Sequence, residues 1–335
     1  MADDVYYGDY LQLGKILDAQ HLESVKRGQP AHDEMLFIVI HQAYELWFKQ
    51  VLYEVGSVID IFNDDHVDDN AGELSIAVHR LRRVQRILEV LVKQIDILET
   101  MTPLDFLDFR DMLRPASGFQ SMQFKILEAK LGLRMEHRFG KQYYTSQFRP
   151  ADKAQIEALE GQPTLFDLVN GWLERMPFLD ARYWPGEAGS FFDRLKAVYS
   201  ASLVKGEEGN VEVWSAIFEN GTAERRMSPA ASRAAIFIML YRDEPIFQNA
   251  FRFLEALLDI DEGLALWRSR HMNMVHRMIG MRVGTGGSTG KAYLKGAMDK
   301  HHIFQEIADL SSFLIERRKL PVLPEALRNA LGYRA

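Results

Sequence analysis

A single histidine lies on the most regular apolar stripe of the chain. Apolar residues recur at intervals of three and four along residues 264–278, and those that share one helical face with His271 are Leu264, Trp267, Met274 and Met278. His271 therefore points inward, where its imidazole is either a core group hydrogen-bonded to the backbone or a metal ligand. His276 lies about 140° further around the same helix, beside Arg277, and we expect it at the surface or behind the site.

A glycine-rich segment, residues 284–291, follows this stripe, and its glycines permit close approach of the backbone to a ligand. The segment departs from a phosphate-binding loop at Thr285 and Ala292, and from a dinucleotide-binding turn at Thr289. It does contain the G-x-S-x-G pattern of serine hydrolases, with Ser288 as the nucleophile, although that motif requires a preceding strand. A serine hydrolase and a flexible connector both remain open on these residues alone.

Residues 32–49 carry a second histidine among aromatic side chains. Helical spacing places four of them on one face, namely Phe37, His41, Tyr44 and Phe48, and Asp33 is positioned to cap the helix. His41 is either a satisfied core group or part of an apolar pocket for a flat ligand. The segment lacks the histidine and glutamate spacing of zinc or di-iron sites, and His301 and His302, adjacent on an expected helix, cannot face one metal together.

Phe106 and Arg110 are four residues apart, so an aromatic ring and a guanidinium can face the same space. Arginine suits the recognition of a carboxylate because its planar fork donates two parallel hydrogen bonds. An ordinary surface pair between Arg110 and an aspartate is the alternative, and these residues alone favour it.

Long amphipathic helices are the elements that must position these side chains. Apolar periodicity predicts helices over residues 33–62, 72–100, 228–258 and 261–281. Thr102 and Ser228 each place a capping hydroxyl directly before a proline, as at the start of a helix. Alternating strand patterns are not evident. We therefore predict a single all-α domain over residues 1–335, in which residues 150–227 form a less regular helical elaboration.

Composition limits the available chemistry and the partners. The 335-residue chain has no cysteine, which excludes disulfides, thiolate-ligated haem and cysteine nucleophiles, so histidine and carboxylates must carry any metal chemistry. The net charge of -7, with both signs interspersed, argues against a nucleic-acid-binding face. The chain shows no apolar run of membrane-spanning length and no signal peptide. We therefore expect a soluble cytoplasmic protein without nucleic-acid or membrane partners.

Taken together, these segments resemble the tryptophan 2,3-dioxygenase family. The resemblance spans nearly the whole chain, is weakest across residues 140–226, and is carried by several long motifs in the same order. These motifs are residues 7–13 (Tyr-Gly-Asp-Tyr-Leu-Gln-Leu), 32–49, 98–103 (Leu-Glu-Thr-Met-Thr-Pro), 109–121 and 267–290. The resemblance implies an all-α fold with a haem pocket between long helices.

The resemblance also implies a cofactor and a reaction. The cofactor is haem b, and the reaction inserts both atoms of O2 into the indole C2=C3 bond of L-tryptophan, giving N-formyl-L-kynurenine in the first step of the kynurenine pathway. His271 matches the proximal haem ligand, and His41 matches the distal histidine that accepts a hydrogen bond from the indole N–H. Phe37 matches a ring packed against the substrate, and Arg110 matches the partner of its carboxylate. Because indole is electron-rich, we expect His41 to position the substrate without acting as an indispensable base.

Further matches imply contributions from a loop and from a second subunit. Thr285 matches a residue that helps to hold the substrate's carboxylate and ammonium, within a glycine-rich lid. Tyr7, Tyr10 and Leu11 match residues that reach the pocket from a neighbouring subunit of a homotetramer, so residues 1–20 are expected to form an exchanged arm. Phe106 stands where some bacterial members of the family have tyrosine.

Two alternative functions remain open. One is a haem-binding sensor without turnover, and the other is a relative that acts on a modified indole.

Overall fold

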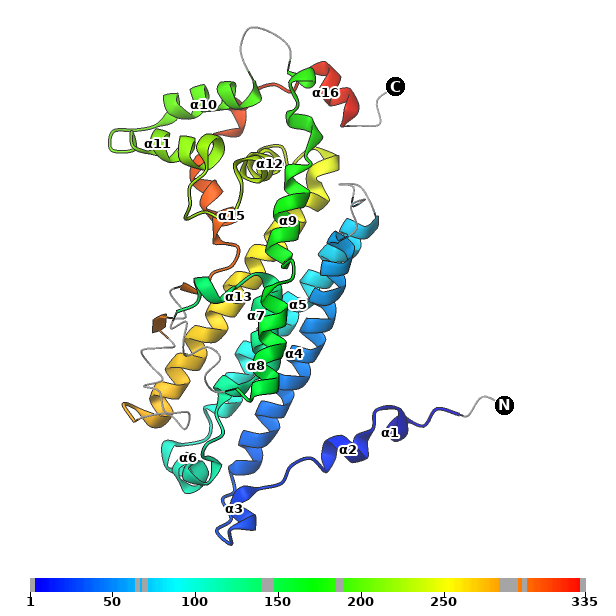
Figure 1. Ribbon diagram of the computed structural model, residues 1–335, viewed down its shortest axis with the longest axis vertical. Helices are drawn as coiled ribbons and strands as arrows, with labels where there is room; N and C mark the ends of the chain where they lie inside the picture. The colour runs from blue at the N-terminus through cyan, green and yellow to red at the C-terminus, as the bar shows by residue number, and fades with distance from the viewer. Residues whose placement is uncertain are drawn as a thin grey trace.

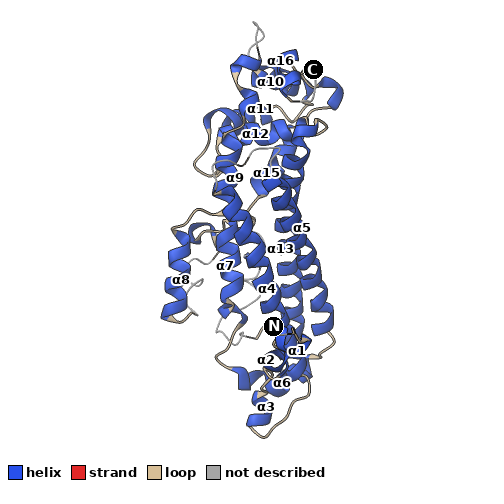
Figure 2. Ribbon diagram, turned by 90° about the vertical axis from the view of Figure 1, so that its right-hand side faces the viewer, coloured by secondary structure: helices blue, strands red, loops and turns tan. Residues whose placement is uncertain are grey.

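The computed structural model describes residues 4–63, 67, 72–139, 148–184, 190–282, 295–296 and 300–331, and all regular secondary structure within these ranges is helical (Figures 1 and 2). The all-α prediction is therefore confirmed. The α-helices are α1 (Tyr7–Tyr10), α2 (Leu13–Leu17), α3 (Glu23–Lys26), α4 (Glu34–Phe62), α5 (Gly72–Leu98), α6 (Pro103–Arg110), α7 (Met122–Leu131), α8 (Pro150–Glu160), α9 (Leu165–Glu174), α10 (Phe191–Ser202), α11 (Asn210–Ser215), α12 (Pro229–Leu240), α13 (Gln248–Ile279), α15 (Gln305–Asp309) and α16 (Glu325–Ala330).

Three long helices, α4, α5 and α13, lie side by side and form the body of the molecule (Figure 1). Their apolar stripes face one another, as the periodicity predicted, and the residues at the centre of the stripe of α4, Val51, Val55 and Val58, are fully buried. The close packing of α13 on α5 depends on Gly263, in the middle of α13. A Cβ atom at Gly263 would lie only 3.1 Å from Cδ1 of Leu88, so the missing side chain lets the two helices approach.

The helix boundaries follow the sequence prediction closely for α4 and α5, but not further along the chain. The sequence predicted a break near residue 259, whereas α13 runs without interruption from Gln248 to Ile279. The break falls earlier, at residues 241–247, where Pro245 begins the 3-10 turn η8 (Pro245–Phe247) after the end of α12. Asp261, the predicted start of a second helix, lies inside α13, and its buried carboxylate accepts hydrogen bonds from the backbone amides of Ile303 and Phe304.

Helix capping matches the prediction at two of the three positions. The hydroxyl of Thr102 accepts a hydrogen bond from the amide of Asp105 at the start of α6, and the hydroxyl of Ser228 accepts one from Ala231 at the start of α12. Asp33 occupies the N-cap position of α4, but its side chain makes no capping hydrogen bond.

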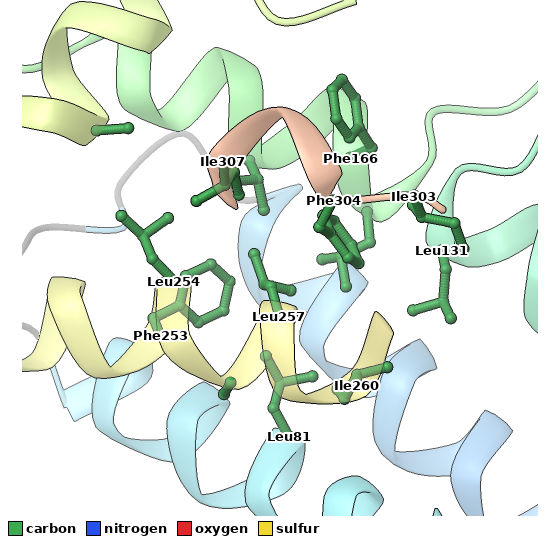
Figure 3. Packing of buried hydrophobic residues seen from close by; sticks show 14 of the residues in the cluster. Leu81, Leu131, Phe166, Phe253, Leu254, Leu257, Ile260, Ile303, Phe304 and Ile307 are labelled. Atoms are coloured by element: carbon green, nitrogen blue, oxygen red, sulfur yellow. The ribbon is translucent and has the colours of Figure 1, made fainter. Parts of the chain in front are cut away.

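The helices α10, α11, α12 and α16 lie at one end of the bundle, α8 lies beside α7, and α13 runs from the body of the molecule toward that end (Figure 1). Near residue 260 of α13, apolar side chains pack simultaneously on Leu81 of α5 and on Phe304 and Ile307 of the C-terminal segment (Figure 3). Further along, an aromatic cluster around Trp214 and Phe313 fills the space between α10, α11 and the 3-10 turn η9 (Leu310–Phe313) that follows α15. Apolar packing therefore joins α13 to the C-terminal segment at this end.

The first helices, α1 and α2, stand away from the bundle (Figure 1). Tyr7 and Tyr10 are 71% and 75% exposed. In the part of the chain that the structure describes, no helix has both the length and the hydropathy to cross a bilayer.

Candidate active site

A cavity between α4 and α13, near α6, brings together residues that are far apart in the sequence. Its volume is about 700 Å³, within the range of roughly 300–1,000 Å³ that is usual for ligand pockets. Side chains of α4, α6, α7 and α13 form its wall, together with the connection between α6 and α7. The predicted site residues that line this cavity are Phe37, His41, Phe106, Arg110 and His271.

His271 lies on the cavity face of α13, flanked on the same face by Met274 and Met278. One turn earlier, the indole of Trp267 stacks on the His271 imidazole, with ring centroids 5.2 Å apart and ring planes within 5° of parallel. Burial, with a smaller contribution from nearby His41, lowers the pKa of His271 from 6.5 to about 4. The imidazole is therefore neutral near pH 7, and a neutral ring nitrogen is what a metal requires of a histidine ligand.

His41 lies on α4 and lines the same cavity. Its Nδ1–H donates to the backbone carbonyl oxygen of Phe37, 2.7 Å away. Burial lowers the pKa of His41 below 6.5, although the Phe37 carbonyl and the charge of Glu45 oppose this shift. In this neutral tautomer, Nε2 carries the lone pair and can accept a hydrogen bond from a ligand in the cavity.

An aromatic wall surrounds His41. The ring of Phe37 lies 4.1 Å from the His41 imidazole, centroid to centroid, and stacks on Phe106 at 5.7 Å. Phe109 packs edge-on against both phenylalanine rings, at 5.6 Å from Phe37 and 5.4 Å from Phe106. Flat apolar surfaces of this kind suit a planar aromatic ligand and keep water away from it.

Arg110 is the last residue of α6, whose first turn is fixed by the capping box of Thr102 and Asp105. The arginine side chain is 4% exposed and lines the cavity, so the alternative of a surface pair with an aspartate is wrong. A buried guanidinium at the edge of an apolar pocket is suited to binding a carboxylate through two charge-assisted hydrogen bonds.

The remaining predicted site residues are not seen in the wall of this cavity in the single chain. Tyr7, Tyr10 and Leu11 belong to the N-terminal arm and are absent from the cavity wall. Thr285 and the glycine-rich segment, residues 284–291, lie outside the described residues. Ser288, the nucleophile of the serine hydrolase alternative, belongs to the same segment and also lies outside the described residues.

Sequence reasoning missed a group of buried charged residues at the cavity wall: Lys125, Glu128, Arg268 and His301. Glu128 accepts hydrogen bonds from Arg268, 2.8 Å away, and from Arg138, 2.6 Å away. The available signal was the pair of charges three residues apart in the largely apolar helix α7.

His301 and His302 lie outside the helices, contrary to the expectation, and face different carboxylates.

Comparison with known proteins identifies the family. The family model described as tryptophan 2,3-dioxygenase matches residues 1–314. The protein named tryptophan 2,3-dioxygenase in Alteromonas mediterranea is 44% identical to this chain, over 98% of this chain and 97% of its own length. The protein of the same name in Bdellovibrio bacteriovorus is 42% identical to this chain, over 98% of both. The protein of that name in Xenopus laevis is 41% identical, over 97% of this chain and 86% of its own. The chain therefore belongs to the tryptophan 2,3-dioxygenase family.

Proposed function

We propose that this chain is a haem-dependent dioxygenase of L-tryptophan that inserts both atoms of O2 into the indole C2=C3 bond and releases N-formyl-L-kynurenine. The observation that carries the proposal is a single aromatic-walled cavity lined by two neutral histidines from opposite helices and by a buried arginine. The name shared by the curated relatives, tryptophan 2,3-dioxygenase, supports the same substrate and O2 as co-substrate for this chain.

His271 is the residue that we assign as the axial ligand of haem b. Among the described residues, no three histidine, cysteine, aspartate or glutamate side chains are grouped so that they could hold a metal ion by themselves. One neutral imidazole beside a wide apolar space fits instead an iron whose equatorial ligands come from a porphyrin. Bound ferrous haem supplies an iron with one coordination position left for O2.

His41, in this proposal, orients the substrate. Its Nε2 lone pair accepts the indole N–H, while the hydrogen bond from Nδ1 to Phe37 holds the ring in the required tautomer. The rings of Phe37 and Phe106 pack against the indole and exclude water from the reacting carbons. Indole is electron-rich at C2 and C3, so the reaction needs alignment more than a strong base.

Arg110 pairs with the substrate carboxylate, which fixes the amino-acid end of the substrate in the cavity. Thr285 belongs to the same proposal as a second contact to the carboxylate and ammonium. With Phe106 in place of a tyrosine, the pocket has no phenol at this position, and recognition of the carboxylate depends on Arg110 and Thr285.

We also propose that the enzyme is a homotetramer in which residues 1–20 of one subunit complete the pocket of a neighbour through Tyr7, Tyr10 and Leu11. The exposure of this arm supports the proposal, since Leu11 is 36% exposed and both tyrosines are more exposed still. Several large side chains grouped on a short projecting segment are typical of a surface that another protein covers.

One experiment tests the reaction. The purified chain is reconstituted with haem, reduced, and mixed with L-tryptophan in air, and we expect a Soret band together with the absorbance of N-formylkynurenine. A Soret band without consumption of tryptophan would favour a haem-binding sensor or carrier. Turnover of a ring-substituted tryptophan but not of L-tryptophan would favour a relative that acts on a modified indole.

A further inference from the structure

The indole of Trp267 and the imidazole of His271 form a parallel pair in the wall of the cavity. Their ring centroids are 5.2 Å apart and their planes lie within 5° of parallel, which is the offset-stacked geometry that aromatic pairs prefer. The two residues are four positions apart on α13, so their side chains are neighbours on one face of the helix. One helix therefore carries both the iron ligand that we assign and a flat surface against it.

An imidazole that binds a metal needs a second contact to fix its plane, since rotation about the Cβ–Cγ bond of histidine is only weakly restricted. In most metal sites that contact is a hydrogen bond from the other ring nitrogen to a carboxylate or a carbonyl oxygen. His41 makes such a bond to the carbonyl of Phe37. His271 makes none to the residues that the structure describes, and the side chain one turn before it is the stacked indole of Trp267. The stack is thus the contact that restricts the imidazole plane here.

Aromatic rings from two other helices hold Trp267 in place. Phe124 of α7 lies 5.0 Å from the indole, centroid to centroid, and Tyr44 and Phe48 of α4 pack edge-on against it at 6.0 and 6.2 Å. Tyr44 is itself fixed, because its hydroxyl donates to the carbonyl oxygen of Leu91 on α5, 2.9 Å away. Contacts that reach α4, α5 and α7 therefore determine the plane of the indole, and the indole in turn faces His271.

We infer that Trp267 is a positioning residue of the cofactor site: its indole fixes the plane of the His271 imidazole and keeps that ring in one orientation toward the iron of haem. This inference rests on the proposed haem function and adds a residue that acts through the axial ligand. The role requires a flat side chain at position 267. An aliphatic side chain would fill part of the same space but would leave the imidazole free to turn.

The test compares Trp267→Phe, which keeps a flat ring, with Trp267→Leu, which does not. Each variant is loaded with haem and reduced, and the iron–histidine stretching band is recorded by resonance Raman spectroscopy. We expect one narrow band in the wild-type enzyme and in Trp267→Phe, and a broadened or split band in Trp267→Leu, because its imidazole populates more than one orientation. Haem should also dissociate about 2- to 10-fold faster from Trp267→Leu, which is the loss expected for one aromatic pair. Phe124→Leu removes a ring that supports the indole and should broaden the band to a smaller extent.

Two controls separate this role from general packing. Protoporphyrin IX, which is haem without its iron, forms no bond to His271, so the wild-type chain and Trp267→Leu should bind it with nearly equal affinity. Phe62→Leu opens a gap in a second group of stacked rings, with Trp172 and Phe253, whose members are absent from the cavity wall. This variant should lower the melting temperature of the chain and leave the iron–histidine band unchanged.

The possible failures are distinguishable. A wild-type band and wild-type haem dissociation in Trp267→Leu, or in Phe124→Leu if the first variant does not fold, overturn the positioning role and leave the haem function intact. An equal loss of haem and of protoporphyrin IX in Trp267→Leu also overturns it, because the indole would then pack on the porphyrin and not act through His271. If the wild-type chain shows no iron–histidine band with haem, the axial assignment fails and this inference fails with it.

Discussion

The imidazole of His41 donates its Nδ1–H to the carbonyl oxygen of Phe37, 2.7 Å away and one helical turn earlier on α4. Because this carbonyl precedes His41 by four residues, the interaction orients the ring from within a single helix, and the ring of Phe37 packs against it at 4.1 Å. The hydrogen bond selects the tautomer in which Nε2 is an acceptor. The site therefore has a positioned acceptor for an N–H group.

Replacement of His41 by alanine should slow turnover of tryptophan by about 10- to 100-fold, the usual effect of losing one positioned hydrogen bond in a transition state. Steady-state formation of N-formylkynurenine measures the effect. 1-Methyltryptophan, which lacks the indole N–H, should be affected little by the same substitution. A variant that binds haem and substrate normally but is completely inactive would show that His41 is a required base.

The pH dependence should follow from the direction of the His41 shift. Burial lowers the pKa of His41 below 6.5, so the neutral acceptor form predominates at neutral pH and the midpoint of Nε2 protonation lies below pH 6.5. We therefore expect kcat/KM to be level at neutral and mildly alkaline pH and to fall on acidification, with a midpoint below pH 6.5. The acid limb should be absent in His41→Ala. An acid limb with the wild-type midpoint in that variant would assign the limb to another group.

His271→Ala should abolish stable haem incorporation. The chain has no cysteine, and His276 is absent from the cavity wall, so α13 offers no second imidazole at the described cavity, only the weaker thioether ligands of Met274 and Met278. The ratio of Soret to protein absorbance after gel filtration measures haem content. His276→Gln on the same helix is the matched control and should retain haem. Normal haem content and turnover in His271→Ala would refute the axial assignment.

Sequence periodicity was sufficient to predict that His41 and His271 point inward, because side-chain direction in a helix is a local property. Burial that depends on distant partners was not predictable in this way. Asp261 can be buried within α13 because amides more than forty residues away donate hydrogen bonds to its carboxylate. Glu128 is buried because Arg268, 140 residues later, reaches it.

The interpretation of Arg110 shows the same limit. Spacing alone allowed both a surface pair and a carboxylate partner, and the choice depends on the packing of α6 against the bundle. The break between α12 and α13 was also missed, although Pro245 marks it in the sequence. Apolar spacing continues across this turn, and periodicity therefore gave the wrong boundary.

Arg110→Leu should weaken binding of tryptophan by roughly 2–4 kcal/mol, because the substrate carboxylate would lose its charged partner in a pocket with little water. Spectral titration of the haem-loaded enzyme measures the affinity. Indole derivatives without a carboxylate, such as tryptamine, should bind the variant and the wild-type enzyme almost equally. If both ligand types lose the same affinity, the substitution has disturbed the pocket and the proposed pairing is not supported.

Deletion of residues 1–13 should both weaken the oligomer and lower activity, because one segment would serve the interface and the neighbouring pocket. The isolated arm has few contacts of its own, and Tyr7 and Tyr10 are 71% and 75% exposed. Sedimentation velocity and steady-state turnover measure the two effects. The alternative is an arm that folds back onto its own subunit, which would also reduce activity on deletion.

Complementation separates these two arrangements. Full-length His271→Ala subunits keep the arm but have no axial ligand, whereas truncated subunits keep His271 and lose the arm. Refolding the two together forms mixed oligomers, in which an exchanged arm from the first kind of subunit can complete the pocket of the second. Activity above that of either parent would then appear, in proportion to the fraction of mixed oligomers. An arm that folds onto its own subunit cannot rescue the truncated chain. Differential tags show whether mixed oligomers have formed. If these mixed oligomers are no more active than the truncated protein, Tyr7 and Tyr10 act within their own subunit.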